Sequence, residues 1–187
     1  ELTTMVITGA GTVAVTNLQS TEAANLNNIT ATTHTASVSA SNTNFTGDIG
    51  DAAVTVDTGA TWTIDGGATV NSGTAVATGT ITGDAAELTT MVITGAGTVA
   101  VTNLDETDAA DLSNITATTH TANVSGSNTS FTGDLGDAAL TVASGTWVVG
   151  NAATISNAAS IVATGTIQGD AAILTGATIT GAGTVAV

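Results

Sequence analysis

The sequence predicts an all-β chain folded as a parallel β-solenoid. Three observations lead to this prediction: an internal repeat, short stretches in which apolar residues alternate with small or polar ones, and few aromatic residues. The 187 residues include no Pro, Cys or Tyr, and aromatic residues make up 2%. Thr, Val and Ile are abundant, and their branched side chains favour strands. Gly, Asn and Asp favour the turns between strands.

The repeat has a period of 86 residues. The segment ELTTMVITGAGTVAVTNL occurs at 1–18 and, unchanged, at 87–104. This pattern predicts two full repeats, 1–86 and 87–172, and the start of a third at 173–187. Because coils of a solenoid must stack on neighbours and no capping sequence is recognisable, we expect one continuous solenoid that is an excerpt of a longer array.

The strands within a repeat are predicted by alternation with a period of two residues. In the first repeat this alternation is clearest at 12–15, 53–56, 61–64 and 79–82. One stretch, 22–28, with its counterpart at 108–114, is compatible with a helix, and we expect at most a single helical turn there.

Strand-turn-strand units recur at intervals of about 12 to 22 residues, which predicts four or five coils in each repeat. The alternative is a row of immunoglobulin-like β-sandwiches, because 86 residues is close to the size of such a domain. A sandwich core normally depends on a buried Trp, and the Trp position shifts by one residue between the copies, at Trp62 and Trp147. A narrow core of Val, Ile, Ala and Thr suits a solenoid better.

The charge of the chain is one-sided: it has 15 Asp and Glu, no Lys or Arg, and a net charge of −15. Without basic side chains the chain cannot neutralise phosphates, so we expect no nucleic-acid partner. It contains no apolar run long enough to span a bilayer, so we expect no membrane insertion. Few groups suited to catalysis remain, and we expect no enzymatic activity.

Acidic residues on glycine turns are the candidate metal ligands. Both repeats contain a GD-x-GDAA motif and a separate GDAA motif, and carboxylates on such turns suit Ca²⁺, which prefers oxygen ligands. The candidate Ca²⁺ ligands are Asp48, Asp51, Asp84, Asp134, Asp137 and Asp170. The alternative is that these side chains close Asx turns and solvate the surface. Neither the EF-hand loop nor the calcium-binding nonapeptide is matched.

Each repeat also contains one histidine, His34 or His120, within the sequence TTHT. We expect both on the surface of a Thr-rich strand. Four or five coils at about 4.8 Å each would place them roughly 19–24 Å apart. They therefore cannot share a metal ion.

Thr-x-Thr pairs recur along the chain and resemble the threonine ladders of ice-binding proteins. Such activity needs one regular ladder on one face. Three threonines have different counterparts in the second copy: Thr61 and Thr63 become Trp147 and Val148, and Thr82 becomes Gln168. This alignment favours the simpler interpretation that Thr is present because it stabilises strands.

The motifs ITGAGTVAV and GD-x-GDAA, in a chain rich in Gly, Thr, Ala and Asn, resemble segments of very large repetitive bacterial surface proteins. The resemblance is to the β-helical stalks of filamentous-haemagglutinin-type and autotransporter adhesins, and it covers the whole chain. It implies a structural role as a rigid extracellular or cell-surface fibre that self-associates end to end or laterally and contacts cell surfaces. The alternative is a binding module, a Thr-rich solenoid for glycans or ice.

Overall fold

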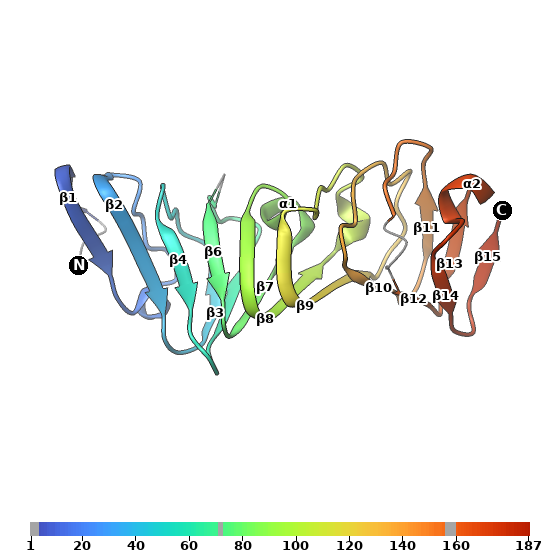
Figure 1. The fold of residues 1–187 in the computed structure, drawn as a ribbon, viewed down its shortest axis with the longest axis horizontal. Coiled ribbons are helices and arrows are strands. Elements are labelled where there is room, and N and C mark those ends of the chain that lie inside the picture. Colours follow the sequence, from blue (N-terminus) through green and yellow to red (C-terminus); the bar gives the residue numbers. More distant parts are fainter. Residues whose placement is uncertain (1–3, 71–72, 156–159) are drawn as a thin grey trace.

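The computed structural model describes residues 4–70, 73–155 and 160–187. Its strands stack along the long axis as a parallel β-solenoid of about nine turns, with the two ends of the chain at opposite ends of the rod (Figure 1). Every pairing between the described strands is parallel, as in β1 with β2 or β5 with β7. A sandwich would pair its strands antiparallel, so the predicted solenoid is confirmed.

The strands of the first repeat are β1 (Ile7–Val15), β2 (Ile29–Val38), β3 (Asn42–Phe45), β4 (Ala53–Val56), β5 (Thr61–Ile64), β6 (Thr74–Ala77) and β7 (Thr80–Asp84). Those of the second are β8 (Val92–Thr102), β9 (Ile115–Val124), β10 (Ala139–Val142), β11 (Thr146–Val149), β12 (Ser160–Ala163) and β13 (Thr166–Gly169). Two more, β14 (Thr178–Thr180) and β15 (Thr184–Ala186), follow in the third. The strands predicted at 53–56 and 61–64 are confirmed to the residue.

In the described part of the chain, four short helical turns interrupt the strands: η1 (Leu18–Ser20), α1 (Ala85–Leu88), η2 (Leu104–Glu106) and α2 (Ala171–Leu174). The helical turn predicted at 22–28 was wrong. Ala24 and Leu26 point into the core and Asn25 points out, so the chain there follows an extended course with strand-like alternation. None of the helices in the described part of the chain is long and apolar enough to cross a membrane.

Each repeat forms four coils, the lower of the two predicted numbers. One column of paired residues runs from Ala14 to Thr35, Ala53, Thr74 and then Val92. Neighbours in this column are 18 or 21 residues apart, so the coils differ in length. Four successive pairings lead along this column from Ala14 to Val92. The residue that corresponds to Ala14 in the sequence of the second repeat, however, is Ala100. The residues paired along this column therefore do not recur at the 86-residue period.

Apart from the pairing of residues 7–9 with residues 29–31, the described strands form three ladders. The first contains residues 12–15 of β1, residues 33–38 of β2, β4, β6 and residues 92–95 of β8, and it ends at residues 115–117 of β9. The second contains β3, β5, β7, residues 98–102 of β8, the second half of β9, and then β10, β12 and β14. The third contains β11, β13 and β15.

Equivalent strands of the two repeats lie on different ladders. β4 belongs to the first ladder and its equivalent β10 to the second, while β5 belongs to the second and its equivalent β11 to the third. The columns of paired residues therefore shift relative to the sequence repeat.

The core runs along the axis and is filled by alternate residues of each strand. In β4, Val54 and Val56 are buried and their neighbours are exposed. The largest core residues form two aromatic pairs, Trp62 with Phe45 and Trp147 with Phe131, each with ring centroids 5.5 Å apart.

The two tryptophans occupy equivalent positions despite the one-residue shift in sequence. Both follow a Thr at the start of a four-residue strand, β5 or β11, and both are fully buried. The shift lies in the preceding bend, which has four residues (57–60) in the first repeat and three (143–145) in the second. The alignment of Thr61 with Trp147 was therefore wrong, and the counterpart of Thr61 is Thr146.

The negative charges lie at the corners of the rod. Among the acidic residues in the described ranges, Asp84, the last residue of β7, is the one within a strand; the others are in bends, loops and short helices. The flat outer faces of the ladders therefore carry neutral side chains.

Candidate functional site

Each repeat joins a histidine of one coil to the GD-x-GDAA turn that begins the next coil. The His34 Nδ1 atom lies 2.9 Å from Oδ1 of Asp51, and the His120 Nδ1 atom lies 2.8 Å from Oδ1 of Asp137. In both pairs the imidazole is 1% exposed, while the carboxylates of Asp51 and Asp137 are 66% and 58% exposed. The prediction that both histidines lie on the surface was wrong.

The turn itself is built from its two glycines and its first aspartate. A Cβ atom on Gly47 would lie 2.0 Å from the carbonyl oxygen of Ala24, so the chain can pass there only as glycine. The Asp48 carboxylate accepts a hydrogen bond from the Gly50 amide at 2.8 Å. Gly50 has a φ of 57°, in the left-handed region that favours glycine. These contacts are those of an Asx turn.

The remaining residues of the motif connect the turn to the core. Ile49 and Ala52 are fully buried, as are Leu135 and Ala138 of the second copy. Asp51 is thereby held over the middle of β2, where it meets His34. The His–Asp pair therefore ties the turn to the preceding coil.

His120 is suited to the neutral form. With Nδ1 donating to Asp137, its buried Nε2 atom has no partner in the described part of the chain. An added proton there would create a buried donor with no acceptor. Burial lowers the pKa of His120 from its ordinary value of 6.5, and the hydrogen bond and charge of Asp137 oppose this only in part.

This pair has the opposite arrangement to a catalytic His–Asp pair. In a catalytic triad the aspartate is buried and the reactive Nε2 atom of histidine faces the substrate. Here the carboxylate faces solvent and Nε2 lies in the core. The pair can stabilise a turn but offers no accessible base. That the chain is not an enzyme stays a prediction.

The six aspartates predicted as Ca²⁺ ligands lie at four separate places. Asp48 and Asp51 share one turn, and Asp134 and Asp137 share its copy. Asp84 accepts hydrogen bonds from Thr102 and Asn103, and Asp170 accepts one from the Ala172 amide at the start of α2.

Most of these carboxylates already have protein partners. Besides Gly50, Asp48 accepts a hydrogen bond from the Asn27 side chain at 3.0 Å. No three Asp, Glu or His residues within 4–70, 73–155 and 160–187 come together as a metal-binding group. The donor set thus fits the Asx-turn alternative better than a calcium site, and calcium binding stays a prediction.

Threonine side chains form a regular pattern on the outer face of the second ladder. We call it the threonine array: one column of Thr61, Thr80, Thr98 and Thr119, and beside it a column of Thr63, Thr82, Ala100 and Thr121. The array covers four consecutive coils and takes strands from both repeats. The sequence alignment missed it because the ladder crosses the repeat boundary.

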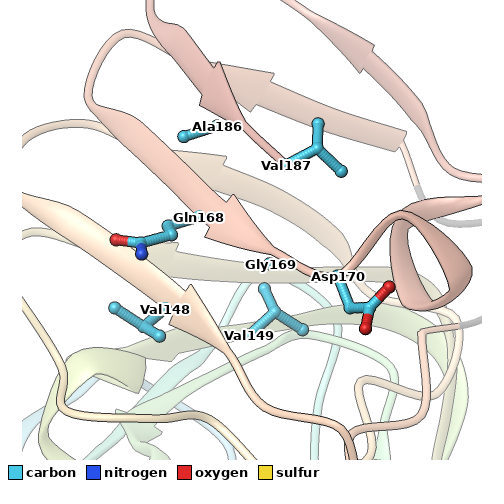
Figure 2. Close-up of a pocket in the computed structure, with 7 residues that line it drawn as sticks. All are labelled: Val148, Val149, Gln168, Gly169, Asp170, Ala186 and Val187. Atoms are coloured by element: carbon cyan, nitrogen blue, oxygen red, sulfur yellow. The ribbon is translucent and has the colours of Figure 1, made fainter.

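A hollow of about 380 Å³ lies on the third ladder (Figure 2). Its outer part is formed by Val148, Gln168 and Ala186, which follow one another in register. These positions correspond to Thr63, Thr82 and Ala100 of the array. The Asp170 carboxylate lies at one side of the hollow, and Val149, Gly169 and Val187 complete its lining.

No protein-family model matches the chain, and no curated protein or solved structure matches it either.

Proposed function

We propose that the chain is a rigid segment of an extracellular bacterial fibre or stalk. The observation that carries this proposal is the unbroken pairing across the boundary between the two repeats. Five consecutive residues of β7, Thr80 to Asp84, pair with Thr98 to Thr102 of β8. The repeats share backbone hydrogen bonds and core, so they cannot bend freely against one another as beads on a string do.

The distribution of charge supports a role in contact with solvent. Carboxylates occupy the corners of the coils, and the chain has no Lys or Arg to pair with them. Rods with one sign of charge repel each other at low ionic strength and stay dispersed. Lateral association would use the neutral sheet faces, such as that of the first ladder, where Val76 and Val92 are 43% and 45% exposed.

A glycan-binding role has no comparable support. Sugar sites commonly stack a sugar ring on an exposed aromatic side chain. The four aromatic residues of this chain, Phe45, Trp62, Phe131 and Trp147, are all fully buried. The fibre therefore remains the proposal of choice.

An antibody raised against the 187-residue chain tests the proposed location and shape on cells that make the parent protein. We expect gold-labelled antibody to decorate thin, uniform filaments on intact cells, with no added signal after permeabilisation. Label that appears only after permeabilisation, or label on compact particles, would contradict the proposal.

A further inference from the structure

The threonine array differs from an ordinary Thr-rich strand in the regularity of its two columns. Seven of its eight positions are Thr, and Ala100 is the exception. The columns lie on adjacent outward positions of the same four strands. Coils stack about 4.8 Å apart, and outward neighbours along a strand are about 6.6 Å apart. The result is a small two-dimensional lattice of hydroxyl and methyl groups.

The hydroxyl groups of this lattice are free to bind a ligand. No described residue hydrogen-bonds to the side chains of the six array threonines other than Thr121, whose hydroxyl donates weakly to the Val99 carbonyl at 3.4 Å. The branched side chain of Thr has restricted χ1 rotation. Backbone pairing on both sides fixes the strands that carry them. These groups are already ordered before a ligand binds, so binding would cost little conformational entropy.

The array is also free of charge. Two acidic residues border it: Asp84 at the end of β7, whose carboxylate is held by Thr102 and Asn103, and the exposed Asp65 directly after β5. A charged group orders water around itself in a geometry that an ice lattice cannot accept. A neutral face of methyl and hydroxyl groups has no such conflict, because the hydroxyls can take the place of lattice waters and the methyls can lie between them.

We infer that the threonine array binds ice. Its two spacings are close to those between rows of oxygen atoms in the ice lattice, so water held by the hydroxyls can continue directly into the crystal. This activity goes beyond the proposed fibre, because it resides in four coils and needs no filament. Failure of either proposal would leave the other standing.

Ice shaping and thermal hysteresis, the gap between melting and freezing temperatures of a seed crystal, test the inference on the 187-residue chain. We expect the chain to facet the crystal and to open such a gap. A chain labelled with dye at its amino terminus should bind particular ice planes. Round, unshaped crystals and no plane-specific label from the folded chain would overturn the inference.

Paired substitutions locate the activity. Thr80→Tyr places a bulky ring in the middle of the array and should abolish ice shaping. Its matched control is Thr166→Tyr, the equivalent position on the third ladder, which should leave ice shaping unchanged. Thr61→Tyr, at the edge of the array, serves as a second variant if Thr80→Tyr does not fold, and circular dichroism reports folding. If folded variants of array and control behave alike, the array is not the ice-binding face.

Discussion

The outer faces of the second and third ladders are built from equivalent strands, yet their surfaces differ. In β5, β7 and β8 the outward positions are Thr61 and Thr63, Thr80 and Thr82, and Thr98 and Ala100. In β11, β13 and β15 they are Thr146 and Val148, Thr166 and Gln168, and Thr184 and Ala186. One column of Thr is common to both faces. In the second column, Val148 and Gln168 of the third ladder stand where the second ladder has Thr63 and Thr82. A hollow lies at these positions in place of the flat array.

The inner sides of the same strands remain alike. Trp62 and Trp147 fill the same core position, each against a Phe of the preceding coil. Close packing restricts what an inward position can hold, whereas outward positions contact solvent. The fold therefore depends on the inner column, and the second outer column can acquire a separate function on one face without changing the fold.

The largest effect is expected from core substitutions, and it should be equal on the two ladders. Trp62→Ala and Trp147→Ala should each lower the free energy of unfolding by about 3–5 kcal/mol, because a large cavity remains in a narrow core. Denaturant unfolding measures the loss. Thr63→Ala and Val148→Ala, on the outer faces, are controls with expected losses below about 0.5 kcal/mol. An unchanged free energy of unfolding in the Trp147→Ala variant would contradict a core that is equivalent on the two ladders.

A smaller but clear loss is expected at the GD-x-GDAA turn. Gly47→Ala and Gly133→Ala should each lower the free energy of unfolding by about 1–3 kcal/mol, because the added Cβ overpacks the turn. In the structure it would lie 2.0 and 1.9 Å from carbonyl oxygens. Gly11→Ala, where nothing lies within 4 Å, should change the thermal melting temperature little. Equal effects at Gly11 and Gly47 would rule out the close approach.

A pH effect is expected from the second His–Asp pair. Burial holds the pKa of His120 below 6.5 in the folded chain, so the unfolded chain binds a proton more readily. The stabilising contribution is then complete above pH 6.5 and is lost as the pH falls below it. His120→Gln should remove this loss, so the melting temperatures of the two proteins converge as the pH is lowered from 7.5 to 5.5. A constant difference would contradict a neutral, buried His120.

The smallest effect is expected from calcium. Since the carboxylates of Asp48 and Asp134 each accept a hydrogen bond from their own turn, we expect Ca²⁺ to shift the melting temperature no more than NaCl at equal ionic strength. Asp48→Asn keeps the acceptor oxygen and is the matched variant. A calcium-specific rise in melting temperature that Asp48→Asn removes would restore the metal site predicted from the sequence.

Much of the fold could be predicted because period-two alternation and tandem repetition are local signals. The assignment of the strands to ladders could not, since it depends on spacings of 18 and 21 residues between paired positions that the 86-residue repeat conceals. The burial of His34 was missed for a related reason: its partner Asp51 is 17 residues away on the next coil. A signal was present, because His120 and Asp137 recur at the same separation. The threonine array was missed because it joins strands of two repeats.

Helical reconstruction of a filament of these repeats by electron cryomicroscopy tests the central claim most directly. We expect a continuous rod with an axial rise of about 19 Å per 86-residue repeat, from four coils at about 4.8 Å each. Separate globular beads, or an axial rise far from this value, would contradict the account.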